Sequence, residues 1–319
     1  MKVPRRINDL VKAKQAFIDS QRTKLTASVA KLQEQLLTAI LAEIIPRLET
    51  DPSGLILDTE ANYRLISELD AIYRKYGMLT KGKVLKEVNS TFTAISDKDY
   101  DFLTITLGGD LPEKFREVAE ATRKMTEFRF GVSGGRFVRG GFLEALMGEM
   151  NPLALKRHLA KLITSQVNTK DFIKALTYFF QGAEGFAKKF ERFAFDVYQQ
   201  YDATYNSRLA QKLELKNFIY QGGLIEDSRD FCAAHDAKVW TVEEAEKWDT
   251  WTPAQGKREN QFPEGWVIKQ KDPYKVPSYL GYAGYDPLID RGGYNCRHQL
   301  TFISDELARR LRPRKEGKE

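Results

Sequence analysis

Cysteine and histidine are scarce in this sequence, which has 2 cysteines and 3 histidines among its 319 residues. It also lacks an apolar run of about 18 residues, the length that a membrane-spanning helix needs. The longest such segment, Leu36–Ala42, is soon interrupted by Glu43 and Pro46. No apolar segment follows the opening residues Met-Lys-Val-Pro-Arg-Arg, so we expect no secretory signal. We therefore predict synthesis in a cytosol, no membrane partner, and cysteines that are thiols rather than a disulfide framework.

Charge is nearly balanced over most of the chain. The formal net charge is +6, and the tail Arg309–Glu319 holds six basic and two acidic residues. No broad basic region or DNA-reading motif accompanies this tail, which argues against a sequence-specific DNA-binding protein. A basic tail can still contact phosphates non-specifically, although a solvated, frayed terminus has the same composition. The candidate phosphate contacts are Arg309, Arg310, Arg312, Arg314 and Lys315.

The first 130 residues are predicted to be mainly helical. Apolar residues recur at helical spacing from Arg5 to about Leu48, with charged and amide residues between them. A second helix is predicted over Glu60–Lys75, and Gly77 is its expected stop. The stretch 79–107 mixes helix-favouring and strand-favouring residues. These features indicate a helical region that begins with one long amphipathic helix.

Residues 131–221 are predicted to form a second helical region. Its glycine-rich segment 131–141 lacks the Gly-Lys-Ser/Thr ending of a phosphate-binding loop, so we expect a flexible connection there. A long helix is predicted in this region from about Ala183 towards Phe218. Aromatic and aliphatic residues follow one another along it at intervals of three or four, which is typical of a packing face.

The composition changes near Gly222. All 4 tryptophans lie between Trp240 and Trp266, and prolines are concentrated in the same region. Short strands are predicted at Lys238–Thr241, Trp266–Lys269 and Gln299–Ile303. The sequence thus predicts an α+β protein, in which an elongated, mainly helical N-terminal region (1–130 and 131–221) precedes a small, loop-rich α+β module with a basic tail (222–319).

Two short segments of this module contain both cysteines and two of the three histidines. The first contains Cys232 and His235, and the second contains Cys296 and His298. Thiolate and imidazole are the usual ligands of structural zinc, and residues i and i+2 of a strand face the same side. These four residues are therefore a candidate zinc site, although their spacing matches no standard zinc finger.

Three other chemical interpretations use the same two segments. A Cys232–Cys296 disulfide would require oxidation after release from the cytosol. Cys232 with His298 and Asn295 contains the residue types of a cysteine hydrolase, and Asn295 with His298 suggests a metal-dependent nuclease.

The interpretation that we favour is structural. The cysteines are then buried thiols, and polar side chains tie the two segments together as a clasp around a turn made by two glycines. The residues of this predicted clasp are Asp227, Arg229, Cys232, Arg291, Gly292, Gly293, Asn295, Cys296, Arg297 and His298.

A family resemblance rests on the same residues. Ser228-Arg-Asp-Phe-Cys232, the Lys238-Val-Trp that follows, and Arg291-Gly-Gly-Tyr-Asn-Cys-Arg-His298 resemble the C-terminal module of phage minor head proteins, the family typified by head-morphogenesis protein F of phage Mu. The resemblance covers roughly residues 215–305, and its second half is the most specific. The positions that match are Arg229, Cys232, Arg291, Asn295, Cys296, Arg297 and His298. The sequence departs from the pattern at His235 and at Ala237, where the family more often has glycine.

The resemblance implies a virion structural protein without enzymatic activity. Such proteins are made in the host bacterial cytoplasm, associate with the portal protein and other head proteins, and stay inside the capsid in few copies. They assist procapsid assembly, DNA packaging or DNA delivery, and non-specific contact with double-stranded DNA would suit that location. Structural zinc is the one cofactor that the sequence suggests. The alternative is an enzyme or toxin-like effector carried in the head, a Cys/His hydrolase or a metal-dependent nuclease.

Overall fold

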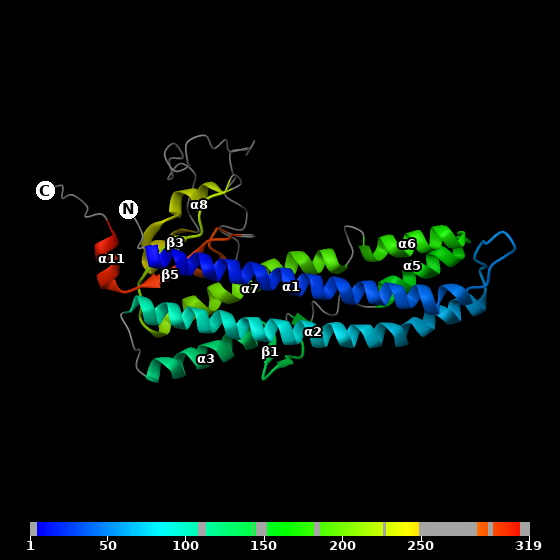
Figure 1. The fold of residues 1–319 in the computed structure, drawn as a ribbon, viewed down its shortest axis with the longest axis horizontal. Coiled ribbons are helices and arrows are strands. Elements are labelled where there is room, and N and C mark those ends of the chain that lie inside the picture. Colours follow the sequence, from blue (N-terminus) through cyan, green and yellow to red (C-terminus); the bar gives the residue numbers. More distant parts are fainter. Residues whose placement is uncertain are drawn as a thin grey trace. The chain divides into compact units, whose positions relative to one another are not determined.

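The structure, a computed structural model, describes residues 5–107, 113–141, 143–144, 152–181, 186–225, 228–248, 286–292 and 296–312 (Figure 1). Its longer helices are α1 (Arg5–Glu43), α2 (Glu60–Thr106), α3 (Glu113–Arg129), α5 (Pro152–Thr164), α6 (Thr169–Gln181) and α7 (Phe186–Lys212). Its short helices are η1 (Ile45–Arg47), α8 (Asp230–His235), α9 (Val242–Ala245), α10 (Pro287–Asp290) and α11 (Asp305–Leu311). Its strands are β1 (Val132–Ser133), β2 (Arg136–Phe137), β3 (Asn217–Gln221), β4 (Lys238–Thr241) and β5 (Gln299–Ile303). The α+β class with a helical N-terminal region, predicted from the sequence, is confirmed.

The chain forms two compact units, and each is assembled from separate segments. One unit comprises Met1–Asp19, Phe92–Thr126 and Asp196–Glu319, and the other comprises Ser20–Thr91 and Glu127–Phe195. The sequence predicted instead the consecutive regions 1–130, 131–221 and 222–319. The difference arises because α1, α2 and α7 are long enough to contribute to both units, a property that local composition does not reveal.

In the unit of Ser20–Thr91 and Glu127–Phe195, α2 pairs with α1. The Ser28 hydroxyl donates to Glu87 Oε1 at 3.0 Å, and Val29 and Val84 are fully buried. The predicted stop at Gly77 is wrong, because α2 continues through Gly77 and Gly82 to Thr106. A glycine inside a helix costs only about 1 kcal/mol, which the burial of the apolar face of α2 offsets.

The glycine-rich segment 131–141 is a short hairpin instead of a flexible connection. Strands β1 and β2 pair antiparallel, with Ser133 opposite Arg136. The two residues between them, Gly134 and Gly135, have φ angles of 53° and 70°. Positive φ at both central residues is the requirement of the tightest hairpin turns, and glycine meets it without steric cost.

In the other unit, α7 ends earlier than predicted. The helix finishes at Lys212, and Phe218 lies in β3 rather than in a continued helix. Its aromatic stripe is a packing face, as expected: Tyr201 and Tyr205 are buried, and Tyr201 stacks on Phe92 with ring centroids 3.8 Å apart.

The C-terminal module is built on a three-stranded antiparallel sheet in the order β4-β3-β5. The predicted strands at Lys238–Thr241 and Gln299–Ile303 are confirmed, as is the Thr241–Glu244 capping box. The candidate strand Trp266–Lys269 lies outside the described residues. Figure 1 shows α11 beside this sheet, with the N-terminal end of α1 nearby.

Both faces of the central strand β3 are covered, which explains its nearly continuous apolar sequence. Ile219 packs with Ile7 of α1, Ile303 of β5 and Leu311 of α11. On the opposite face, aromatic rings gather around Tyr220, including Phe231 and Trp248. Tyr220 therefore directs its hydroxyl into the aromatic side of the module, where the two Cys/His segments also lie.

Candidate functional site

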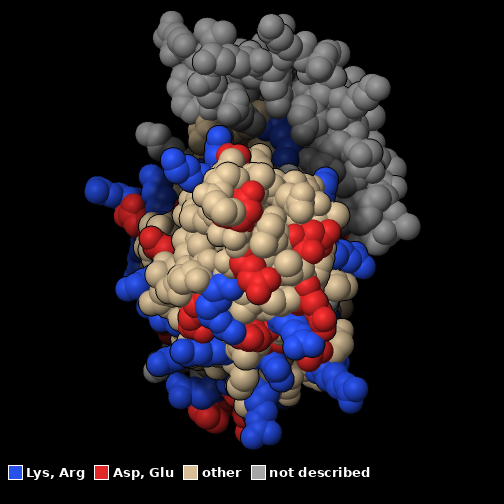
Figure 2. Space-filling model, turned by 90° about the vertical axis from the view of Figure 1, so that its right-hand side faces the viewer, with Lys and Arg blue, Asp and Glu red and all other residues tan. Residues whose placement is uncertain are grey.

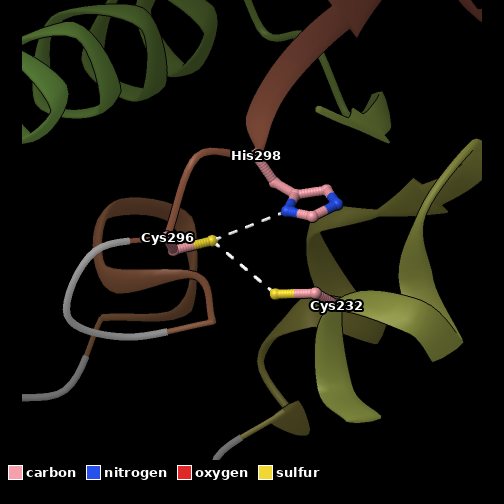
Figure 3. Close-up of side chains that lie close together, drawn as sticks. All are labelled: Cys232, Cys296 and His298. Atoms are coloured by element: carbon pink, nitrogen blue, oxygen red, sulfur yellow. Dashed lines mark hydrogen bonds between the residues drawn. The ribbon is translucent and has the colours of Figure 1, made fainter. Parts of the chain in front are cut away.

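The two cysteine-containing segments meet at the side of β3 that carries Tyr220. Cys232 lies on α8, whereas Cys296 and His298 lie in the segment immediately before β5 (Figure 3). The two sulfur atoms are 3.9 Å apart, and the Cys296 sulfur is 3.8 Å from Nδ1 of His298. The Tyr220 hydroxyl is 3.5 Å from the Cys232 sulfur and 3.4 Å from the Cys296 sulfur. All four side chains are buried.

The second nitrogen of His298 faces a carboxylate. Its Nε2 lies 3.2 Å from Oδ1 of Asp236, the residue that follows α8. The backbone N–H groups of Gly222 and Gly223 donate to the same oxygen at 3.2 and 3.3 Å, so the carboxylate is held in place. Asp236, His298 and Cys296 therefore stand in series, with the imidazole between an acid and a thiol.

Proton affinities in the cluster are strongly shifted. Hydrogen bonding with Cys232 lowers the pKa of Cys296 well below its usual value, despite the opposing effect of burial, and His298 contributes in the same direction. The same hydrogen bond and burial raise the pKa of Cys232. Burial lowers the pKa of His298, but Asp236 and Cys296 outweigh it and raise that pKa to about 9. The contact between the two sulfurs thus shifts the pKa values of the two cysteines in opposite directions.

Two glycines allow the backbone to approach the cluster closely. A Cβ atom at Gly292 would lie 2.6 Å from the Cys232 sulfur and 3.2 Å from the Cys296 sulfur. A Cβ at Gly222 would lie 2.7 Å from the Cα of His298. Both separations are shorter than ordinary atomic contacts, so both positions require glycine for space rather than for backbone conformation.

Two arginines hold the backbone around the cluster. Arg229 donates to the carbonyl of Gly292 at 2.8 Å, which ties the start of α8 to the second segment. The buried guanidinium of Arg291 donates to the carbonyls of Ile289 (3.1 Å), His298 (2.5 Å) and Gln199 (3.3 Å). Arg291 has a φ of 53°, an uncommon conformation for a residue with a side chain. These bonds join α7, the end of α10 and the start of β5.

Not every residue of the predicted clasp and zinc site is part of this cluster. His235 turns away, because its Nδ1 donates to the carbonyl of Phe231 at 2.6 Å and its ring stacks on that of Phe231. Burial lowers the pKa of His235 to about 4. The Arg297 side chain is exposed. The predicted positions Asp227, Gly293, Asn295, Arg314 and Lys315 lie outside the described residues.

One basic residue of α11 and one just after the helix are paired with acids. Arg310 forms an ion pair with Glu306, and Arg312 forms one with Glu244. Arg309 and Arg312 also line a pocket of about 1120 Å³, which Glu243 and Glu246 line as well. In the described part of the basic tail, Arg310 and Arg312 therefore have acidic partners.

Sequence reasoning missed the residues that complete the cluster. Tyr220 reads as an apolar strand residue, and Asp236 reads as a turn residue beside the more conspicuous His235. The one sequence feature that points to this part of the cluster is the Gly222-Gly223 pair, but a pair of glycines also fits a domain boundary.

A second buried polar group lies among the helices of the same unit and was also missed. Lys14 of α1 contacts Asp99 of α2 at 2.6 Å and Asp202 of α7 at 2.7 Å. The side-chain exposures of these residues are 10%, 2% and 1%, respectively. Burial and the neighbouring Asp202 raise the pKa of Asp99, although Lys14 opposes the shift. One cation here joins three helices.

Comparison with known proteins gives no relative: no family model matches the chain, and neither a curated protein nor a solved structure matches it. Among the helices that the structure describes, none combines the length and the apolar character needed to cross a lipid bilayer.

Proposed function

We propose that this chain is a phage minor head protein, which associates with the portal vertex inside the head and assists procapsid assembly, DNA packaging or DNA delivery. The proposal begins from the resemblance of its two Cys/Arg/His segments to that family. The observation that supports it best is the meeting of these segments, whose cysteines are 64 positions apart in the sequence, in one buried cluster. Such a cluster stabilises a module, which suits a structural component.

Burial distinguishes a structural cluster from an open catalytic site. Cys232, Cys296 and His298 are 4%, 5% and 4% exposed. Their polar atoms are directed at one another, at Tyr220 and at Asp236. A substrate would have to displace this packing before it could reach either sulfur.

Exposed apolar side chains are candidates for portal contact. Met125 and Phe128, one turn apart on α3, are 61% and 58% exposed, and Met78 on α2 is 73% exposed. Large apolar side chains on a helix surface are common at protein interfaces, where methionine and aromatic residues are enriched. Helix contacts of this kind would account for binding to the portal without a catalytic function.

Contact with DNA, in this proposal, is weak and non-specific. On the face drawn in Figure 2, Lys and Arg side chains are interspersed with Asp and Glu rather than gathered in one basic area. Three of the predicted phosphate contacts, Arg309, Arg310 and Arg312, are among the described residues. Of these, Arg309 and Arg310 are exposed, whereas Arg312 is half-buried. Binding through such a tail is salt-dependent and independent of sequence.

The test is co-expression of this chain with the portal protein encoded in the same genome. We expect the chain to elute with portal oligomers, and the isolated chain to bind duplex DNA only at low salt. In the double variant Arg309→Gln/Arg310→Gln, the slope of log K for DNA binding against log salt concentration should become shallower by about one for each lost phosphate contact. Portal binding should be retained. A folded chain that binds neither the portal nor DNA would contradict the proposal.

The series Asp236–His298–Cys296 favours one alternative, a cysteine hydrolase delivered with the genome. An acid that orients an imidazole beside a thiol is the arrangement of cysteine hydrolases. In that case Cys296, and not the Cys232 expected from the sequence, is the nucleophile. The native protein should then react with iodoacetamide at Cys296 alone, and His298→Gln should abolish the reaction. Protection of both thiols in the native protein argues against this alternative.

A further inference from the structure

We propose that Cys232, Cys296 and His298 bind a zinc ion, which locks the two segments of the C-terminal module together. The two sulfur atoms and a ring nitrogen of His298 lie within 4.8 Å of one another, and all three side chains are buried. They supply three of the four positions of a tetrahedral site. The inference is independent of the proposed role at the portal, since it concerns how the module is held together.

The distances between the donor atoms fit zinc. In a tetrahedral site with Zn–S bonds of about 2.3 Å and a Zn–N bond of about 2.0 Å, two sulfurs are about 3.8 Å apart, and a sulfur and a nitrogen are about 3.5 Å apart. The structure has 3.9 Å between the sulfurs and 3.8 Å between Cys296 and His298. These two pairs need shifts of only a few tenths of an ångström. The third pair, Cys232 and His298, lies within 4.8 Å, so metal binding draws these two side chains together by up to about 1 Å.

The separation of the two sulfur atoms disfavours a disulfide between Cys232 and Cys296. An S–S bond is about 2.05 Å long, so the sulfurs would have to approach by nearly 2 Å from their separation of 3.9 Å. Gly292 is packed against Cys232, and Tyr220 contacts both sulfurs. The surrounding atoms thus hold the sulfurs at the spacing of two metal ligands.

The neighbours of the ligands are those of a metal site. Histidine ligands of zinc commonly donate their second ring nitrogen to a carboxylate, which fixes the tautomer and the ring orientation. Asp236 lies on this side of the ring: its Oδ1 is 3.2 Å from Nε2 of His298, although the two atoms are not aligned as a hydrogen bond, and the N–H groups of Gly222 and Gly223 hold the carboxylate there. With the proton on Nε2, the Nδ1 lone pair is directed at Cys296 (Figure 3) and is available to a metal ion.

The chemistry of the donors selects the ion. Two thiolates and an imidazole favour zinc over magnesium or calcium, which prefer oxygen ligands. The Tyr220 hydroxyl, 3.4 and 3.5 Å from the sulfurs, can donate to a bound thiolate. Binding releases the thiol protons and connects α8 to the segment before β5, so that part of the binding free energy contributes to folding.

The experiment measures zinc in the purified full-length chain. After dialysis against a weak chelator, we expect one zinc per wild-type chain. Cys232→Ser, Cys296→Ser and His298→Gln should each lose it. His235→Phe is the matched control, because His235 belongs to the same helix as Cys232 but lies outside the proposed ligand set. This variant should keep one zinc per chain.

A further variant tests the carboxylate. Asp236→Asn should weaken zinc binding about 10- to 100-fold, as measured by competition with a chromophoric chelator. Zinc that is lost from His235→Phe but retained by a folded His298→Gln would overturn the proposal. So would a folded wild-type chain without zinc whose mass and thiol content show a Cys232–Cys296 disulfide.

Cobalt substitution keeps the proposal testable if the ligand variants do not fold. The wild-type chain loaded with Co²⁺ should show an intense thiolate-to-metal charge-transfer band and the visible bands of a tetrahedral ion. A spectrum without charge transfer would show that the cysteines do not coordinate the metal, and would overturn the proposal.

Discussion

Gly292 lies so close to Cys232 that a Cβ atom on the glycine would be only 2.6 Å from the cysteine sulfur. Gly292→Ala must therefore displace the sulfur from its position beside Tyr220 and Cys296. Overpacking of this kind costs about 1–3 kcal/mol, so we expect the free energy of unfolding to fall by that amount in a denaturant titration.

Gly82→Ala is the control for this substitution. Gly82 lies inside α2, where a new Cβ would have no atom within 4 Å. Alanine at such a position should stabilise the protein by about 0.5–1 kcal/mol. Equal effects of the two substitutions would show that the approach of Gly292 to the sulfur is not a constraint.

Ala237 is a position where the chain departs from the glycine of the family that it resembles. Its φ is 56°, its side chain is exposed, and its N–H donates to the carbonyl of Tyr220 at 2.7 Å. Glycine adopts this conformation without the steric cost of a Cβ. We expect Ala237→Gly to raise the free energy of unfolding by about 1 kcal/mol.

The reverse substitution at a matched site checks this explanation. Gly134 has a φ of 53°, and a Cβ atom added there would meet no other atom within 4 Å, so only backbone strain opposes alanine. Gly134→Ala should destabilise the protein by a similar amount. An Ala237→Gly variant that is less stable than the wild type would contradict the account of this turn.

The buried cation Lys14 should be essential to its unit. Lys14→Met leaves Asp99 and Asp202 buried without their positive partner, which costs about 3–5 kcal/mol. Thermal and denaturant unfolding will measure the loss, and adding Asp99→Asn and Asp202→Asn should restore part of it. Arg64→Met is the control, since the exposed Arg64–Glu60 pair contributes less than about 1 kcal/mol.

His235 should make the protein sensitive to acid. Burial lowers its pKa from 6.5 to about 4, so the unfolded chain binds a proton that the folded chain does not bind between these values. Its stabilising contribution is complete above about pH 6.5 and is lost as the pH falls towards 4, up to a total of about 3 kcal/mol. Stability measured against pH should show this loss.

The measurement is made with a strong chelator present, so that competition between protons and metal does not contribute. His235→Phe keeps an aromatic ring among Phe231, Trp240 and Trp248 but cannot take up a proton. Its stability should change less between pH 6.5 and 4 than that of the wild type. Parallel pH profiles for the two proteins would contradict the assignment.

The sequence predicts the elements with strong local signals and misses those set by distant contacts. The Thr241–Glu244 capping box and the strands Lys238–Thr241 and Gln299–Ile303 have such local signals. Helix α2 continues through Gly77 because its far half is buried elsewhere in the fold, a fact that a window around the glycine does not contain.

The residues of the candidate site likewise fall into those that the sequence predicts and those that only the folded chain reveals. Cys232, Cys296 and His298 were found because cysteine and histidine are rare in this chain. His235 was included for its proximity in sequence, but its hydrogen bond to Phe231 turns it away. Asp236 and Lys14 were missed because charged residues are common, and only the folded chain shows which of them are buried beside a partner.

X-ray absorption at the zinc edge tests the central claim of a metal-held clasp most directly. For the wild-type chain purified with zinc, we predict two sulfur neighbours at about 2.3 Å and an imidazole nitrogen at about 2.0 Å. A zinc shell of nitrogen and oxygen alone would contradict the claim, because Cys232 and Cys296 would then not be ligands.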